Sequence, residues 1–240
     1  MSTPGTKEYF DRVAVPFSRN YARDAAFLER KTIWERAVRE NLSRLADDAL
    51  CLDMGCGDGT LGRMVAARGF KTIGFDQSGQ MLALARQRSQ AAGLTTRTDY
   101  IEASLPLPQP MMDRYRGGAG LILCSSVLEY IDAYEDVLTQ FAQLLRPGGR
   151  LIVSVPNEHS LYRLGARLFG RMLAPADSYL RYQRHRFYPQ EFKASLSRLG
   201  YLPVREEYFS LPFQAHSRRL LGAHRGKRTA TLYLLVAERT

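Results

Sequence analysis

The sequence predicts an α/β fold in which helices cover both faces of a doubly wound, mostly parallel sheet. Strand-like and helix-like segments alternate over residues 50–155, and this order requires crossover connections between parallel strands. The first strand runs directly into a glycine-rich turn at residues 55–59. Polar residues follow several of the strands, at the sheet edge where ligands bind in such folds.

The expected elements follow the spacing of the apolar residues. A helical stripe that includes Ile33, Trp34 and Val38 predicts a helix over residues 24–45, with Trp34 in the core. Strands are expected at 50–54, 71–75, 98–102, 120–124 and 149–155, and helices at 60–68, 79–91 and 133–145. The proline- and glycine-rich stretch 104–118 is expected to form a surface loop.

The C-terminal third adds further predicted elements. A helix is expected over 158–174, with leucines on one side and Arg163, Arg167 and Arg171 on another. A basic amphipathic helix is typical of a membrane-surface contact or of a cover over a lipophilic substrate. The alternative is a lid packed on the domain with a solvated arginine face. A helix at 190–199 and strands at 201–209 and 229–237 are also expected.

The glycine turn narrows the choice of ligand. A phosphate-binding P-loop would end in Gly-Lys-Ser/Thr, but this turn continues as Gly59-Thr60-Leu61. A dinucleotide fingerprint needs a third glycine at the position of Thr60, so a dinucleotide is disfavoured. The ligand that remains is a nucleoside with an amino-acid tail and no phosphate.

The segment Asp53-Met54-Gly55-Cys56-Gly57-Asp58-Gly59 resembles motif I of the class I S-adenosylmethionine (SAM)-dependent methyltransferases. An acidic residue, Asp76, ends the next strand about 20 residues on, where it is placed to accept hydrogen bonds from ribose hydroxyls. Further segments resemble the same family in the same order: 100–104, with Glu102 in the acidic position, 121–130 as motif IV, and 144–153. The resemblance covers about residues 45–155.

The resemblance implies SAM as cofactor, S-adenosylhomocysteine (SAH) as product and no metal. The cofactor-binding residues that it implies are Tyr21, Asp53, Gly55, Cys56, Gly57, Asp76, Gln77, Met81, Glu102, Ala103 and Ser125. Tyr21 belongs to an aromatic N-terminal stretch that folds over the cofactor in similar enzymes; a packed arm is the alternative. Asp53 has an alternative role as a brace for the glycine turn.

The family fold implied is a Rossmann-like, seven-stranded sheet with an antiparallel last strand. Residues 1–240 then form one methyltransferase domain. It is divided into an N-terminal helical cap (1–46), a SAM-binding core (47–155), a lid or substrate insertion (156–200) and C-terminal strands (201–240). Residues 181–199 resemble a segment of the ubiquinone-biosynthesis O-methyltransferases.

Three residues are candidates for catalysis. A hydroxyl acceptor benefits from a general base, and histidine is well matched to neutral pH. His185 lies among aromatic residues of the expected lid, and His159 is a second histidine candidate; an ordinary surface histidine is the alternative for both. Glu129 follows the motif IV strand, where it is predicted either to orient a substrate or to begin a helix.

Composition limits the class of protein. The formal net charge is +10, and between Ser160 and Arg228 fourteen Lys and Arg residues stand against four acidic residues. The three cysteines do not suit a disulfide framework or a zinc site, and no apolar run is long enough for a membrane span. No signal peptide is recognised at the N-terminus. A cytoplasmic protein is expected, with a peripheral membrane contact through 158–174; the sequence indicates no oligomeric state.

The predicted function is methyl transfer from SAM to a small, aromatic or lipophilic acceptor at oxygen, by in-line displacement. Nitrogen or carbon methylation of another metabolite is the first alternative. Nucleic-acid methylation is disfavoured, because residues 125–128 lack the Asn/Asp-Pro-Pro-aromatic tetrapeptide of amino-methylating DNA enzymes. A non-catalytic SAM-binding protein is the last alternative.

Overall fold

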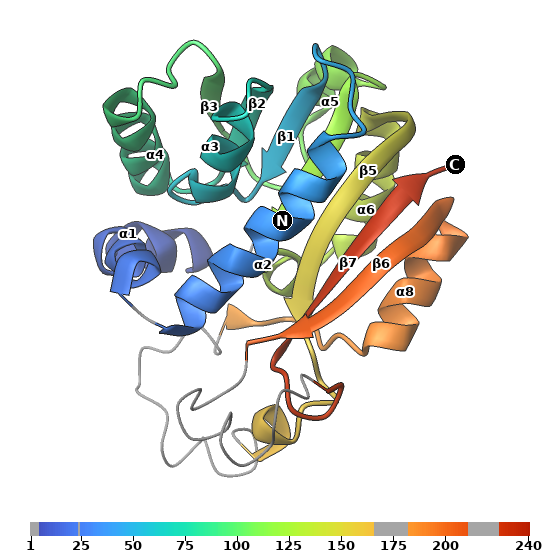
Figure 1. Ribbon diagram of the computed structural model, residues 1–240. Helices are drawn as coiled ribbons and strands as arrows, with labels where there is room; N and C mark the ends of the chain where they lie inside the picture. The colour runs from blue at the N-terminus through green and yellow to red at the C-terminus, as the bar shows by residue number, and fades with distance from the viewer. Residues whose placement is uncertain (1–4, 24, 166–181, 211–225) are drawn as a thin grey trace.

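A computed structural model describes residues 5–23, 25–165, 182–210 and 226–240; for 17–23 and 25–27 it describes the backbone only. In this part of the chain a seven-stranded sheet has the order β3-β2-β1-β4-β5-β7-β6, with helices on both faces (Figure 1). The fold class predicted from the sequence is therefore confirmed. No described helix is long and apolar enough to cross a membrane.

The strands are β1 (Leu50–Met54), β2 (Lys71–Asp76), β3 (Thr98–Glu102), β4 (Ala119–Ser125), β5 (Leu145–Pro156), β6 (Tyr201–Phe209) and β7 (Leu232–Arg239). The described helices are α1 (Thr6–Arg23), α2 (Ala25–Leu42), α3 (Thr60–Ala66), α4 (Gly79–Ala91), α5 (Gln109–Tyr115), α6 (Tyr134–Leu144) and α8 (Pro189–Arg198), with the 3-10 helix η1 (Leu128–Tyr130).

The register of the parallel strands brings the polar residues at their carboxyl ends to the same edge of the sheet. Strands β1 to β5 pair in parallel, and Met54 at the end of β1 lies between Phe75 of β2 and Cys124 of β4. Asp76 pairs with Glu102 in the same way. The residues that follow these strands therefore meet at the carboxyl edge of the sheet. Strand β7 lies antiparallel between β5 and β6, as the resemblance implied.

Two apolar layers hold the helices against the sheet. On one face α2 and α3 pack on β1, β4, β5 and β7, and Trp34 of α2 is fully buried there, as predicted. On the other face α5, α6 and α8 pack on the alternate residues of the same strands. The period of two along each strand explains why both faces are apolar.

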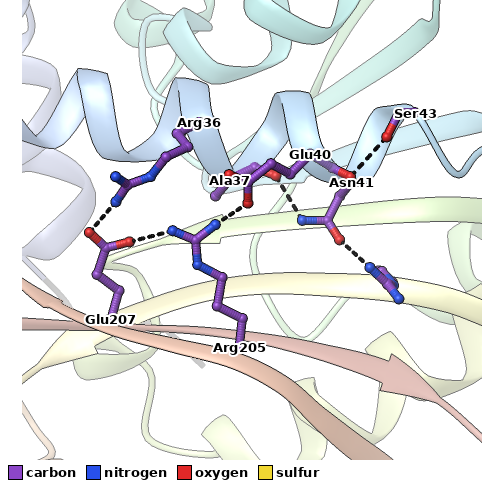
Figure 2. A network of polar contacts seen from close by, with 8 residues as sticks. Arg36, Ala37, Glu40, Asn41, Ser43, Arg205 and Glu207 are labelled. Atoms are coloured by element: carbon purple, nitrogen blue, oxygen red, sulfur yellow. Dashed lines mark hydrogen bonds and ion pairs between the residues drawn. The ribbon is translucent and has the colours of Figure 1, made fainter.

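Ion pairs add a polar connection between α2 and the edge strand β6. Glu207 of β6 accepts from Arg36 through one carboxylate oxygen and from Arg205 through the other, at 2.9 Å (Figure 2). Arg205 also contacts Glu40, one helical turn beyond Arg36. Because Arg36 and Glu40 are four residues apart, the contacts that they make with β6 lie on the same side of α2.

Two sequence-based expectations need correction. The expected loop 104–118 contains helix α5, since Pro110 falls in its first turn, where proline is tolerated, and Met112 and Tyr115 anchor it in the core. The expected helix 133–145 ends at Leu144, and β5 begins at Leu145, earlier than predicted, beside a register shift in its pairing with β4. The N-terminal aromatic stretch, which was predicted to belong to an N-terminal helical cap, forms α1.

The expected helix over 158–174 lies largely outside the described residues; only 161–165 is described as helical. There Arg163 is turned inward: its side chain is 15% exposed, and its Nε donates to Glu158 at 2.8 Å. Leu161 and Leu164 are exposed instead. At Arg163, therefore, the predicted solvated arginine face is wrong, because a nearly buried glutamate attracts the guanidinium.

Candidate active site

The glycine turn leaves β1 in a conformation that favours glycine. Gly55 has φ 70° and Gly57 has φ 52°, both in the left-handed region. A Cβ at Gly55 would collide with Val127, whereas a Cβ at Gly57 would meet open space. The amides of Gly55 and Cys56 both donate to the carbonyl of Phe75 at the end of β2 (2.8 and 2.9 Å). The turn is thus fixed beside the end of β2 and leaves room for a ligand at Gly57.

Asp76 joins this turn to the next helix. Its Oδ2 accepts from the Gly57 amide at 2.8 Å, and its Oδ1 accepts from the Ser78 amide at 2.9 Å. Desolvation raises the pKa of Asp76, and these backbone donors oppose the shift. Each carboxylate oxygen keeps a further lone pair, so a ligand hydroxyl can still donate to Asp76.

Asp53 is directed toward helix α3. It is 1% exposed, and its Oδ2 accepts from the Gly62 amide at 2.8 Å. Burial raises the pKa of Asp53 to about 7. Its position on the α3 side of β1 suits the brace that was the alternative role in the sequence analysis.

Four other expected cofactor residues lie at or shortly after the ends of β2 and β3. Glu102 is exposed and forms an ion pair with Lys7 of α1 at 2.5 Å. Ala103 donates its amide to the Asp76 carbonyl at 2.9 Å. Met81 is 2% exposed in the first turn of α4. Beside them, Gln77 Oε1 is buried without a hydrogen-bond partner.

Ser125, at the end of β4, is held by an arginine that the sequence analysis did not single out. Arg30 Nη2 donates to Ser125 Oγ at 2.6 Å and to its carbonyl at 3.1 Å. Arg30 Nε is buried without a partner. An incompletely paired guanidinium at this edge can bind a carboxylate.

Glu129 lies in η1, just beyond Ser125. It is 2% exposed, and its Oε2 has no hydrogen-bond partner. Burial raises the pKa of Glu129 to about 7, and the charges of Arg30 and Arg163 oppose this shift. The Glu129 carbonyl accepts from the amide of Arg184 at 2.7 Å. A buried carboxyl that titrates near neutral pH is suited to proton transfer.

The histidine candidates lie on the neighbouring segments. His185 donates its amide to the Glu129 carbonyl (3.4 Å), its Nε2 lies 3.0 Å from the Asp132 carbonyl, and its ring contacts Tyr134. Since a carbonyl only accepts, that nitrogen carries the proton and Nδ1 is left as the basic atom. His159 contacts the ring of Tyr188. The structure thus brings the backbone of His185 to Glu129, while the His185 ring lies against Asp132 and Tyr134.

The Cys56 side chain is also placed by the turn. Its thiol is buried, 3.7 Å from the Gly57 carbonyl, and burial raises its pKa well above the usual value. The thiol is therefore protonated. No described group of three His, Cys, Asp or Glu side chains is placed to hold a metal.

Buried polar atoms without partners recur around this edge of the sheet. They include Arg30 Nε, Gln77 Oε1, Ser126 Oγ and Glu129 Oε2. Buried polar groups in folded proteins are nearly always hydrogen-bonded, and these atoms are available to a polar ligand. With the open space at Gly57, they fit a ligand that has hydroxyl, amine and carboxylate groups, such as SAM.

One expected residue and two residues that the sequence analysis missed remain. Tyr21 lies in α1, but its side chain is outside the described residues. Arg30 and Asp11, which contacts Ser78, were not singled out, because both sit on charged helical stretches without a motif. They are connected to the site only by contacts with Ser125 and Ser78, which are far from them in the sequence.

A family model described as "Methyltransferase domain" matches residues 26–204, which is most of the chain. The tRNA 5-carboxymethoxyuridine methyltransferase of Escherichia coli (strain K12) is 31% identical over 153 residues, which are 63% of this chain and 58% of the relative. The ubiquinone biosynthesis O-methyltransferase of Erwinia tasmaniensis is 29% identical over 109 residues, 45% of this chain and 43% of the relative. The chain therefore spans about half the length of these relatives.

Among solved structures, the magnesium protoporphyrin IX methyltransferase from Synechocystis PCC 6803 with bound SAH is similar over nearly its whole length. The TM-score is 0.70 at 17% identity, and the match covers 98% of this chain and 97% of the other. At this identity the likeness supports the fold.

Proposed function

The chain belongs to the family of methyltransferase domains, and from that premise we propose that it transfers the methyl group of SAM to oxygen on a small aromatic or lipophilic acceptor. The observation that carries the proposal is the Asp76 carboxylate, hydrogen-bonded at 2.8 Å to Gly57 of the turn that leaves the neighbouring strand. Asp76 thereby connects the end of β2 to the glycine turn after β1, and a nucleoside with an amino-acid tail would contact both.

Three residues would hold the cofactor in this proposal. Asp76 accepts from the ribose hydroxyls, and the bare Gly57 backbone allows the ligand to lie close to the chain. Arg30 takes the methionine carboxylate with the donor atom that is unpaired. SAM supplies a methyl group already activated by a sulfonium, so the protein mainly orients the acceptor, which can contribute roughly 7–11 kcal/mol.

We propose Glu129 as the leading general base and His185 as the second candidate. Glu129 is buried at the end of β4, has an unpaired oxygen and titrates near neutral pH, which suits removal of a hydroxyl proton. His185 offers Nδ1, since its Nε2 is engaged with Asp132. Glu129 is favoured because it is deeply buried next to Ser125 and Arg30.

Calorimetry with SAH tests the cofactor assignment. Asp76→Ala should abolish measurable SAH binding. Asp113→Ala, at an exposed carboxylate of α5, should bind SAH as the wild type does. Equal affinity in the two variants would remove the ribose assignment, and circular dichroism of both variants controls for folding.

The acceptor requires a separate experiment. The ubiquinone-enzyme relative and the aromatic residues around residues 182–188 support a small oxygen acceptor. Transfer of a labelled methyl group from SAM to a cell extract, followed by fractionation, should place the label in the lipid or small-molecule fraction. Base hydrolysis of the labelled product then distinguishes an ester from an ether, an amine or a carbon product. No transfer at all would favour a non-catalytic SAM-binding protein.

RNA is the second candidate acceptor, favoured by the tRNA-methyltransferase relative and by the basic segment between Ser160 and Arg228. A label that becomes soluble after ribonuclease treatment would establish it. Turnover that falls steeply with salt would point the same way, because phosphate contacts are screened.

We also propose a peripheral membrane contact through the described start of the 158–174 segment. Leu161 is 62% exposed and Tyr162 44% exposed, and the neighbouring residues Lys227 and Arg228 are exposed cations. Co-sedimentation with anionic vesicles should be lost on Leu161→Glu, with Leu202→Glu on the β6 edge as the matched control. Equal sedimentation of the two variants would contradict this contact.

A further inference from the structure

Two charged residues of helix α1 contact the ends of β2 and β3, where the cofactor is proposed to bind. Lys7 pairs at 2.5 Å with Glu102, the last residue of β3. Asp11 Oδ1 accepts from Ser78 Oγ at 2.6 Å and lies 3.4 Å from the Gln80 amide, just past β2. Lys7 and Asp11 are one helical turn apart, so they face the same way.

Ser78 is hydrogen-bonded to both Asp11 and Asp76. It is fully buried and caps α4, because its Oγ accepts from the Met81 amide at 3.1 Å. Its amide donates to Asp76 Oδ1, and Asp76 Oδ2 accepts from the Gly57 amide. The hydroxyl has a single proton, and Asp11 accepts it, which leaves a lone pair directed at Met81. A continuous chain of hydrogen bonds therefore runs from Asp11 through Ser78 and Asp76 to the glycine turn.

Helix α1 also contacts the part of the site beside Glu129, where the acceptor is proposed to bind. The Phe10 ring lies 5.5 Å from the ring of Tyr130, the residue after Glu129, and the Tyr9 ring lies 4.8 Å from the ring of Tyr182. Edge-to-face and tilted arrangements at these distances are favourable aromatic contacts. Helix α1 thus bridges the end of β2 and the end of β4, on the two sides of the glycine turn.

We propose that Asp11 is a positioning residue for the methyl-transfer reaction: it docks α1 beside the end of β2, where Asp76 lies, and so also holds Phe10 of the same helix against Tyr130. The proposal rests on the cofactor assignment to Asp76 made above. Asp11 does not contact the reacting groups; it acts through Ser78. The Asp11 carboxylate matters because a charged acceptor forms a stronger hydrogen bond than a neutral one.

Affinity for SAH and hydrogen exchange test the proposal. Asp11→Ala should raise the Kd for SAH roughly tenfold, as expected for loss of a charge-assisted hydrogen bond. Asp11→Asn should lose less affinity for SAH, because the amide oxygen of asparagine still accepts the Ser78 hydroxyl proton. Glu8→Ala is the matched control: Glu8 lies on the same helix, is exposed and accepts only a local hydrogen bond from Gly5 among the contacts described. It should leave the affinity unchanged.

Hydrogen exchange separates positioning from a purely structural role. In the wild type, SAH should slow exchange of the amides of both residues 9–14 and residues 55–62. In Asp11→Ala, SAH should still protect 55–62 but no longer protect 9–14. If Asp11→Ala does not fold, Asp11→Asn provides both readouts.

The proposal is overturned if Asp11→Ala and Glu8→Ala bind SAH equally, or if SAH leaves exchange of residues 9–14 unchanged in the wild type. Loss of SAH affinity in Asp76→Ala together with normal affinity in Asp11→Ala would reject the positioning role and keep the cofactor assignment. Normal affinity in Asp76→Ala would reject the cofactor assignment itself.

Discussion

Asp53 should make the ligand-free protein less stable as the pH rises. Its carboxyl is 1% exposed, and burial raises its pKa from 3.8 to about 7. The folded state therefore holds a proton that the unfolded state has released, and stability falls between about pH 4 and pH 7. At about 1.4 kcal/mol per pH unit, the loss over that window is about 4 kcal/mol.

Asp53→Asn removes this dependence, because an amide does not titrate and its oxygen still accepts from Gly62. The difference in unfolding free energy, variant minus wild type, should rise by about 3 kcal/mol from pH 5 to pH 7 and then level off. Urea unfolding of both proteins without ligand at pH 5, 6, 7 and 8 measures it. Asp113→Asn, at an exposed carboxylate, is the control. A difference for Asp53→Asn that stays constant from pH 5 to pH 8 would show that folding does not raise the pKa of Asp53.

Three further perturbations test separate parts of the structure. Gly55→Ala should destabilise the protein by about 3 kcal/mol, because φ is positive and the Cβ collides with Val127; an unchanged thermal midpoint would contradict this. Glu129→Gln should lower kcat/KM by about 10²–10⁴-fold and abolish the rise of rate with pH through about 7, since only the ionised carboxyl accepts a proton; a wild-type pH profile would rule Glu129 out as the base. Glu207→Gln should cost about 1 kcal/mol in urea unfolding, because Arg36 loses its charged partner at the edge of the sheet, and an unchanged midpoint would show that this pair adds nothing.

The sheet and the position of its ligand edge were predictable from local patterns. The spacing of apolar residues predicts most of the strands and helices between residues 50 and 155, and a parallel sheet places the residues at the carboxyl ends of its strands together. Asp76 was found in this way, because it ends a strand directly beside the glycine turn. Helix α5 was missed because Pro108 and Pro110 indicate a loop, although proline also suits a first helical turn.

The contacts that complete the site were not visible in any local pattern. Arg30 meets Ser125 and Asp11 meets Ser78 across long stretches of chain, and each looks like an ordinary charge on a helix. The orientation of Arg163 was missed for the same reason. A helical wheel places it with the other arginines, but Glu158 draws it inward. Such partners become visible only once the fold brings the segments together.

A crystal structure of the complex with SAH would show where the ligand lies relative to Asp76 and the glycine turn. We expect ribose hydroxyls within hydrogen-bonding distance of the Asp76 carboxylate and the amino-acid tail of the ligand against the backbone of Gly55 and Gly57. A ligand bound elsewhere, or one that leaves Asp76 without a ribose contact, would contradict this expectation.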